Sequence, residues 1–371
     1  MRLPDFPWDS LAAHAERARS HPDGVVDLSI GTPVDPVPAL IQKALASVAD
    51  LPGYPATYGT PELRQAAADA LSRRFGVTVE PAAVLPTIGS KELVAWLPTL
   101  LGLGRGDLVV IPELAYPTYE VGALLAGADL VRADLVRADP AGAGADVLDA
   151  LGARRPKLLW LNSPANPTGR VLSAEELRAV VDWARDHDVV VASDECYLSL
   201  GWEAEPVSVL HPSVSGGDAT GLLAVHSLSK SSNLAGYRAG FITGDRGLVR
   251  KLLEIRKHAG LIVPRPVQEA MAVALGDDDH VREQRDRYAR RRTILRPALW
   301  GAGFTIEHSE AGLYLWATRR EPAWDSVSWL AERGILVAPG TFYGPTGDRH
   351  VRVSLTATDE RIAAAAARLA G

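Results

Sequence analysis

Short apolar runs alternate with segments of helical periodicity from about residue 36 to about residue 245. Most of the runs are flanked by Gly, Pro or Asp, which is typical of short strands bounded by turns. Strands that alternate with helices indicate an α/β fold whose sheet is largely parallel and is covered by helices on both faces. We expect about seven strands, at residues 83–85, 108–111, 130–133, 158–161, 189–192, 222–225 and 240–242.

The intervening segments carry the residues that start helices. Pro61 precedes one apolar-periodic segment and Ser173 precedes another, and both residue types are favoured at helix N-termini. The pattern therefore predicts helices between the strands, among them residues 61–75, 91–101 and 174–187.

The pattern changes after about residue 262. A long charged helix is predicted at 278–300, with strands near 314–316 and 351–354, which together indicate a second, smaller α+β domain. We interpret the interleaved arginines and acidic residues of that helix as a solvated face. Residues 138–146, ADPAGAGAD, are expected to form a loop. The predicted domains are 1–35 as an N-terminal arm and part of the small domain, 36–262 as the large domain, and 263–371 as the small C-terminal domain.

Composition narrows the classes of function. The 371 residues carry a net charge of -6, with no basic excess of the kind that nucleic-acid binding needs. The single cysteine, Cys196, rules out an intrachain disulfide and a multi-cysteine zinc site, so we expect a reducing cytoplasm and no metal. The longest apolar run, 93–103, is broken by Pro98 and is too short for a membrane span, and no signal peptide is evident.

The segment HSLSKSSNLAGYRAGF, residues 226–241, places Lys230 in a Ser-rich turn after a predicted strand. A lysine in such a turn can be desolvated and partly deprotonated, as a Schiff-base nucleophile requires, and Arg238 beside glycines suits a phosphate. From this segment alone, a surface lysine in a polar loop is an equally good interpretation.

Two further strands end in polar residues. LNSPANPTGR, residues 161–170, places Asn166 in an irregular loop at the carboxyl end of a strand, where open α/β sheets bind ligands. VVVASDECYLSL, residues 189–200, ends in Asp194 and Tyr197. A buried carboxylate there is costly unless a cation, such as a protonated pyridine nitrogen, pairs with it. The alternative for residues 161–170 is an ordinary turn, and the alternative for Asp194 is a structural aspartate bonded to backbone amides.

The order Asn-x-Pro-x-Asn-Pro-Thr-Gly, Ser-Asp-Glu-x-Tyr, Ser-x-Ser-Lys and Gly-x-Arg-x-Gly resembles the fold-type I, class I/II aminotransferases over essentially the whole chain. The resemblance implies pyridoxal phosphate as cofactor. It also implies that Lys230 bonds to the cofactor and moves the substrate proton, that Asp194 keeps the pyridine nitrogen protonated, and that Asn166 and Tyr197 hold the 3′ oxygen.

The same resemblance implies which residues bind the cofactor phosphate. Ser227, Ser229 and Arg238 look like its ligands, together with backbone amides at Gly89-Ser90-Lys91, where a strand leads into a helix.

Other matches concern the ring, the substrate and the partner chain. Tyr116 occupies the position of the aromatic ring that stacks on the pyridine. Gly31 looks like the glycine whose backbone approaches the substrate carboxylate in the family, and Asn166 is also implied to bind substrate. Arg352 falls inside an alternating strand, where an inward-facing guanidinium needs an anion such as an α-carboxylate. Tyr54 matches a tyrosine that reaches the phosphate in the neighbouring subunit, with Tyr58 as the competing candidate, so the resemblance implies a homodimer with shared sites.

Within the family, LPDFPWDSL, HPDGVVDLSIGTPVDPVP and IPELAYPTYEVGALLAGA look like the succinyldiaminopimelate aminotransferases of lysine and diaminopimelate biosynthesis. The implied reaction converts N-succinyl-2-amino-6-oxopimelate and glutamate to N-succinyl-L,L-diaminopimelate and 2-oxoglutarate. Lys91 and Arg265 are basic residues expected near the mouth of the site, where a solvated role is equally compatible with the sequence. Either the partner chain or the N-terminal arm around Phe6 and Trp8 is expected to close the site over the distal part of the substrate.

Several alternatives remain within and beyond this family. Aminotransferases for aspartate, aromatic or other amino acids share the cofactor residues, as do carbon–sulfur β-lyases. A regulator with an aminotransferase-like sensor is disfavoured, because only about thirty residues precede the first motif and a helix-turn-helix domain does not fit there. A catalytically inactive homologue is disfavoured because each matched polar position keeps a competent residue. We expect small-molecule substrates, and neither nucleic-acid nor membrane partners.

Overall fold

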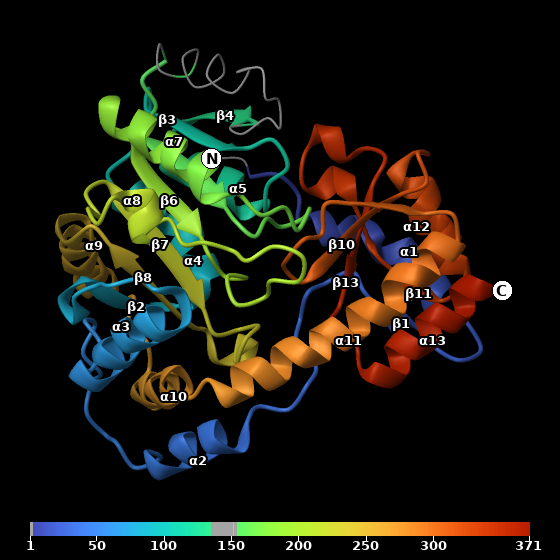
Figure 1. Cartoon of the computed structure of the whole chain (residues 1–371), viewed down its shortest axis with the longest axis horizontal. Coiled ribbons are helices and arrows are strands. Elements are labelled where there is room, and N and C mark those ends of the chain that lie inside the picture. Colours follow the sequence, from blue (N-terminus) through green and yellow to red (C-terminus); the bar gives the residue numbers. More distant parts are fainter. Residues whose placement is uncertain (1–2, 135–150, 152–153) are drawn as a thin grey trace.

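The computed structural model describes residues 3–134, 151 and 154–371, which are arranged around two main sheets (Figure 1). The loop predicted at 138–146 lies outside the described residues. Helix α11 (Asp279–Gly301) runs from the region of the larger sheet to the region of the smaller one (Figure 1).

The larger sheet has seven strands, as predicted. In spatial order they are β2 (Val84–Ile88), β8 (Ala239–Gly244), β7 (Leu222–Ser227), β6 (Val190–Asp194), β5 (Leu158–Asn162), β3 (Leu108–Pro112) and β4 (Asp129–Ala133). Strand β8 is antiparallel to both of its neighbours, and every other neighbouring pair is parallel. The carboxyl ends of β5, β6 and β7 therefore lie at one edge of the sheet, which is where the predicted site motifs begin.

Successive residues of the central strands enter two different hydrophobic cores. In β5, Leu159 packs on one face while Trp160 packs on the other, because side chains alternate along a strand. Both faces are covered, so these strands are apolar throughout. The first core takes in α2 (Ala39–Ser47), α3 (Pro61–Phe75), α7 (Ala174–Asp186), α8 (Pro212–Ser215) and α10 (Arg265–Gly276). The second takes in α4 (Gly89–Leu100), α5 (Thr118–Ala126) and α9 (Arg246–Ala259).

The helix boundaries follow from local capping. Helix α3 begins at Pro61 because the Thr60 side chain accepts a hydrogen bond from the Leu63 N–H, and α7 begins after a capping box between Ser173 and Glu176. Both starts are as predicted. Helix α4 begins at Gly89, two residues earlier than predicted, so its N-terminus lies directly at the end of β2.

The smaller antiparallel sheet has the order β12 (Ala338–Pro339), β13 (Val351–Ser354), β10 (Tyr314–Thr318) and β9 (Thr305–Glu307). A separate pair, β1 (Val26–Asp27) with β11 (Ile335–Leu336), joins the N-terminal segment to this region. Helices α1 (Ala12–Arg19), α11, α12 (Ala323–Glu332) and α13 (Asp359–Ala370) share its core. Short 3-10 helices are η1 (Pro7–Leu11), η2 (Pro81–Ala83), η3 (Ala235–Tyr237), η4 (Gly340–Phe342) and η5 (Pro345–Gly347).

The predicted division into domains at residue 262 stays a prediction. Helix α10 follows that position, yet Val267, Ala270 and Met271 belong to the core of the larger sheet, so its packing is with the large assembly. Among the described residues, no helix has the length and apolarity needed to cross a membrane.

Candidate active site

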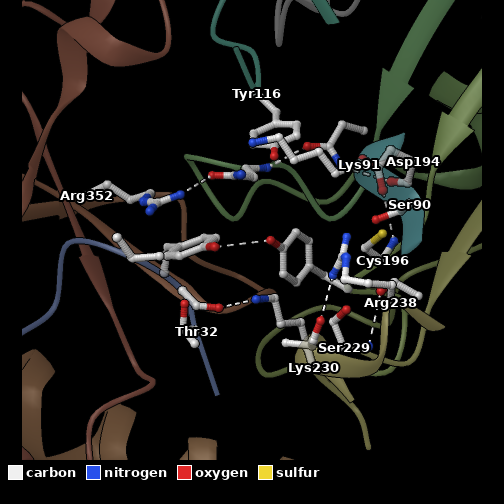
Figure 2. A pocket seen from close by; sticks show the side chains of 18 of the residues that line it. Thr32, Ser90, Lys91, Tyr116, Asp194, Cys196, Ser229, Lys230, Arg238 and Arg352 are labelled. Carbon is white, nitrogen blue, oxygen red and sulfur yellow. Dashed lines mark hydrogen bonds between the residues drawn. The ribbon is translucent and has the colours of Figure 1, made fainter. Parts of the chain in front are cut away.

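A cavity of about 490 Å³ lies at the carboxyl ends of β5, β6 and β7 and reaches the smaller sheet (Figure 2). Its volume is within the usual range for small-molecule sites. The predicted site residues that line it are Gly31, Ser90, Lys91, Tyr116, Asn166, Asp194, Tyr197, Ser227, Ser229, Lys230, Arg238 and Arg352. The fold thus brings together motifs that lie more than three hundred residues apart in the sequence.

Lys230 lies in the turn after β7, and its ammonium group points into the cavity (Figure 2). The Lys230 Nζ donates a hydrogen bond to the Gly31 carbonyl, and the Tyr288 hydroxyl donates to the Lys230 carbonyl at 3.3 Å. Burial lowers the pKa of Lys230. A lowered pKa favours the neutral amine, which is the nucleophilic form. The surface-lysine interpretation is wrong.

Asp194 is the last residue of β6 and is buried. The Tyr119 hydroxyl donates to its Oδ2 at 2.9 Å, and the Cys196 N–H donates to its Oδ1 at 3.2 Å. Burial raises the pKa of Asp194, and no cationic side chain among the described residues supplies a compensating charge. A protonated pyridine nitrogen is a cation of the right size for this cavity, so the carboxylate suits that group.

The start of α4 and the turn around Arg238 form a cradle for an anion. Gly89 has a φ of 70° and does not itself line the cavity, but a Cβ there would collide with the Arg238 guanidinium. The Arg238 Nη1 donates to the Ala235 carbonyl at 2.7 Å, which fixes the guanidinium beside the helix N-terminus. The Ser229 N–H donates to the Ser227 hydroxyl at 3.1 Å. A helix N-terminus, a guanidinium and hydroxyl groups together suit a phosphate.

Asn166 and Tyr116 also line the cavity. The Asn166 amide oxygen accepts from Arg352 Nη1 at 2.9 Å, so its amide nitrogen is the atom that can donate toward a ligand. Tyr116 lies edge-on to Tyr119, with ring centroids 5.9 Å apart. Since Tyr119 in turn holds Asp194, this aromatic pair connects two walls of the cavity.

Arg352 projects from β13 into the cavity and is almost fully buried. Besides Asn166, it donates through Nη2 to the Ser29 carbonyl at 2.8 Å, and its Nε has no hydrogen-bond partner. No carboxylate in the described part of the chain pairs with it. An uncompensated buried guanidinium is unfavourable, so the site needs an anionic ligand there.

Gly89 and Tyr54 are the predicted residues outside the cavity lining. Tyr54 is fully exposed, so within one chain it contributes nothing to the site. The competing candidate, Tyr58, is engaged locally: its hydroxyl donates to the Ala82 carbonyl at 3.0 Å, and Arg64 lies 3.9 Å above its ring. Arg265, expected near the mouth, does not line the cavity, whereas Lys91 does.

Several lining residues were not identified from the sequence. Tyr314 is one of them, and Tyr119, which does not line the cavity, supports Asp194 from behind. Tyr314 lies on the strand adjacent to that of Arg352, and only the register of β10 with β13 places the two on the same side. The remaining unpredicted residues of the lining are Ile30, Thr32, Asn162, Cys196, Ala235 and Gly236.

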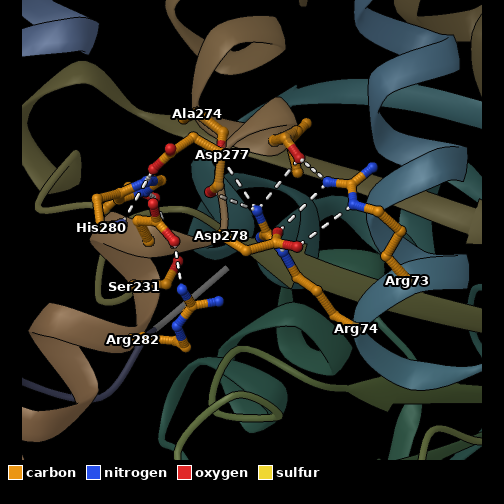
Figure 3. A network of polar contacts seen from close by, with 11 residues as sticks. Arg73, Arg74, Ser231, Ala274, Asp277, Asp278, His280 and Arg282 are labelled. Carbon is orange, nitrogen blue, oxygen red and sulfur yellow. Dashed lines mark hydrogen bonds and ion pairs between the residues drawn. The ribbon is translucent and has the colours of Figure 1, made fainter.

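The turn that carries Lys230 is anchored to the junction of α10 and α11. Ser232 Oγ and His280 Nε2 are 2.9 Å apart, and His280 Nδ1 lies 2.6 Å from Asp277 Oδ2. Figure 3 shows this junction, where Asp278 also pairs with Arg74 at 2.6 Å. Because Ser232 is buried and two residues from Lys230, the contact restrains the position of the lysine rather than offering a second site.

The site's residues and their supporting strands define a class of protein. The chain matches the family "Aminotransferase class I and II" over residues 23–369 and therefore belongs to it. The fold is that of the fold-type I transferases, the cofactor is pyridoxal phosphate, and the substrates are amino acids and 2-oxo acids.

Two individual relatives and one solved structure are similar to this chain over nearly its whole length. The chain is 65% identical to "Probable aminotransferase Rv1178" from Mycobacterium tuberculosis, with 99% of this chain and 85% of that protein covered. It is 59% identical to "4-dedimethylamino-4-oxo-anhydrotetracycline transaminase OxyQ" from Streptomyces rimosus, with 99% of both covered. The structure resembles a probable N-succinyldiaminopimelate aminotransferase from Thermus thermophilus, with a TM-score of 0.88, 30% identity, and 98% and 99% of the two chains covered.

Proposed function

We propose that the chain catalyses the reversible transamination between N-succinyl-L,L-diaminopimelate and 2-oxoglutarate, in the cytoplasm, as part of lysine and diaminopimelate biosynthesis. The observation that carries the reaction class is the shared cavity of Lys230 and the unpaired buried Arg352. The substrate rests on relatives: the Thermus thermophilus protein above, and an LL-diaminopimelate aminotransferase from Desulforudis audaxviator that is 35% identical, with 94% of this chain and 90% of that protein covered.

The proposed chemistry uses Lys230 as the base. When bound, the cofactor accepts the electron pair released from the substrate Cα–H bond. Lys230 Nζ would take the proton from the substrate Cα and pass it to the cofactor, because its lowered pKa makes the neutral amine available. Asp194 holds the pyridine nitrogen protonated, and its burial without a cationic side chain makes that interaction strong.

The remaining cofactor residues position the ring and the phosphate. Asn166 and Tyr197, which line the cavity, would donate to the ring oxygen, and Tyr116 would cover the ring face. We assign the phosphate to Arg238 and to the groups clustered around it, namely the Ser227 and Ser229 hydroxyls and the backbone amides of residues 89–91.

Substrate binding begins at Arg352, whose planar guanidinium suits an α-carboxylate, with Asn166 and the Gly31 backbone beside it. The N-terminal arm supplies part of the cavity wall. Phe6 and Trp8 line the cavity with ring centroids 5.5 Å apart, and Lys91 Nζ lies 5.5 Å from the Phe6 ring. An apolar cover with one ammonium group suits a long substrate that ends in carboxylates.

The arm offers a test of specificity that is separate from catalysis. Deleting residues 1–10 removes Phe6 and Trp8, so we expect kcat/KM to fall more for the succinylated acceptor than for oxaloacetate. The matched variant is Lys91→Ala in the intact chain, which tests whether the Lys91 ammonium binds the distal carboxylates of the substrate. An equal loss on long and short acceptors would show that the arm only stabilises the fold.

We further propose a homodimer in which Tyr54 completes the phosphate site of the partner subunit. The supporting observation is that Tyr54 is fully exposed in the single chain, unlike the half-buried Tyr58. A large exposed tyrosine without a local contact is suited to an interface.

A second candidate is the amination of a ketone on a fused polycyclic ring, favoured by the 59% identity to OxyQ. The aromatic cover of Phe6 and Trp8 is compatible with a flat ring system as well as with a succinyl chain. A ring ketone carries no α-carboxylate, so it would leave Arg352 unpaired during the second half of the reaction.

The test is a panel of donors and acceptors with purified enzyme. We expect glutamate to be the preferred donor and N-succinyl-2-amino-6-oxopimelate to be preferred over oxaloacetate, over the unsuccinylated oxopimelate and over an anhydrotetracycline ketone. Preference for oxaloacetate or for the ring ketone would overturn the substrate assignment, and pyruvate release from cystathionine would indicate a carbon–sulfur lyase.

A further inference from the structure

Tyr314 joins the cofactor end of the cavity to the carboxylate end. It is the first residue of β10, opposite Ser354 of β13, and it is buried in the cavity wall. Its ring packs on one residue of the proposed site and its hydroxyl contacts another. None of the roles assigned above includes it.

The hydroxyl end of Tyr314 lies beside Tyr197. The two hydroxyl oxygens are 3.2 Å apart, and the two rings are edge-on with centroids 5.8 Å apart. A Cβ on residue 31 would collide with the Tyr314 hydroxyl, so the hydroxyl can lie here only because residue 31 is a glycine. Since Gly31 also accepts the Lys230 hydrogen bond, the Tyr314 hydroxyl lies where three site residues meet.

The ring of Tyr314 supports Arg352. The Arg352 guanidinium carbon is 3.8 Å from the Tyr314 ring centroid and 4.9 Å from that of Tyr343. A guanidinium over an aromatic face is held electrostatically, more strongly where water is excluded. The guanidinium plane is therefore fixed by Tyr314 on one side and by its hydrogen bonds to Asn166 and Ser29.

We propose that Tyr314 is a positioning residue for transamination: its hydroxyl donates to the Tyr197 oxygen, which leaves the Tyr197 hydrogen directed at the cofactor oxygen, while its ring orients Arg352. A phenol has one hydrogen, so a donor to Tyr197 decides where the Tyr197 hydrogen goes. The proposal rests on the proposed role of Tyr197 but not on the substrate assignment.

The charges around Tyr314 support this direction of the hydrogen bond. Burial opposes ionisation of Tyr314, but the groups around it, first among them the positive charge of Arg352, outweigh burial and lower its pKa. Burial raises the pKa of Tyr197 well above its ordinary range. In an unsymmetrical pair the more acidic hydroxyl is the better donor. Cys196 acts in the opposite sense and raises the pKa of Tyr314, and the buried Tyr116, Tyr288 and Tyr343 also interact with it.

The test is Tyr314→Phe in the holoenzyme, which removes the hydroxyl and keeps the ring over Arg352. Hydrogen bonds in a chain strengthen one another, so losing the donor weakens the Tyr197 bond to the cofactor oxygen. We expect the pKa of the lysine-linked cofactor, read from its visible absorbance, to rise by about half a pH unit. The kcat of the glutamate half-reaction should fall about three- to tenfold with KM within about twofold.

Two matched variants separate the possible outcomes. Tyr343→Phe removes another buried hydroxyl near Arg352, one without a hydrogen-bond partner among the described residues, and should leave the absorbance titration unchanged. Tyr197→Phe should raise the cofactor pKa more than Tyr314→Phe. If Tyr197→Phe moves that pKa and Tyr314→Phe does not, the proposal for Tyr314 is overturned, whereas no shift in either variant refutes the role of Tyr197 on which it rests.

A third variant tests the ring. Tyr314→Leu loses both contacts, and we expect KM for glutamate to rise about five- to twentyfold beyond the value for Tyr314→Phe. Thermal unfolding of each holoenzyme checks that the fold is kept. A Tyr314→Phe variant that raises KM alone would show that the hydroxyl binds substrate directly, and this result would also overturn the proposal.

Discussion

Removing the guanidinium of Arg352 tests the link between its unusual environment and substrate binding. In Arg352→Ala, the cavity keeps its aromatic walls but loses the one cation that bonds Asn166 and Ser29. Truncating one partner of a buried charge pair costs about 2–5 kcal/mol. At 1.36 kcal/mol for each factor of ten, we expect kcat/KM to fall by about 30- to 5000-fold for every α-amino acid.

The assay combines steady-state kinetics with spectroscopy. KM for glutamate and for 2-oxoglutarate should rise, while the visible absorbance of the bound cofactor stays unchanged, because Arg352 lies at the substrate end of the cavity. Arg352→Lys should recover part of the loss, since an ammonium keeps the charge but cannot form the two-point contact. Arg282→Ala, which removes an exposed cation from α11, serves as the control and should stay within about twofold of the unmodified enzyme.

Two results would refute this reasoning. An unchanged KM in Arg352→Ala would mean that the substrate carboxylate binds elsewhere and that the buried guanidinium is structural. Loss of the cofactor absorbance in a folded variant would mean instead that Arg352 holds the cofactor.

Three further outcomes follow from the site. Lys230→Ala should abolish both the visible absorbance of the bound cofactor and transamination while circular dichroism shows a folded protein; normal turnover would contradict its assignment. Hybrid dimers of Lys230→Ala and Tyr54→Phe chains should place both defects in one site and leave the other intact, so activity no better than the average of the two parents would count against shared sites. Burial lowers the pKa of His280 below 6.5, so the stability that its neutral form contributes is present above pH 6.5 and is lost as the pH falls. In chemical denaturation, the unfolding free energy of His280→Asn should therefore decline less between pH 7 and 5 than that of the unmodified protein. An identical decline would contradict this.

The sequence by itself determined the fold class and named most of the candidate residues that share the cavity. Apolar runs bounded by Gly, Pro or Asp predicted all seven strands of the larger sheet, because a strand buried on both faces must be apolar throughout. Capping residues such as Thr60 and Ser173 fixed helix starts locally. Lys230, Asp194 and Asn166 were recognisable because each lies in a short motif at or just beyond the end of a strand, and the carboxyl ends of parallel strands meet at one edge.

Only the tertiary structure decided what surrounds those residues. Asp194 and Arg352 are buried without a charged partner among the described residues. This depends on residues distant in the sequence, so no local sequence pattern predicts it. Tyr314 became visible as a site residue only through the register of β10 with β13, because a shift of one residue would turn its side chain to the other face. The arm residues Phe6 and Trp8 were expected at the mouth, but their packing beside Lys91 depends on contacts between segments more than eighty residues apart. Local sequence fixes backbone conformation and residue type, whereas electrostatic environment depends on which chain segments exclude water from which charge.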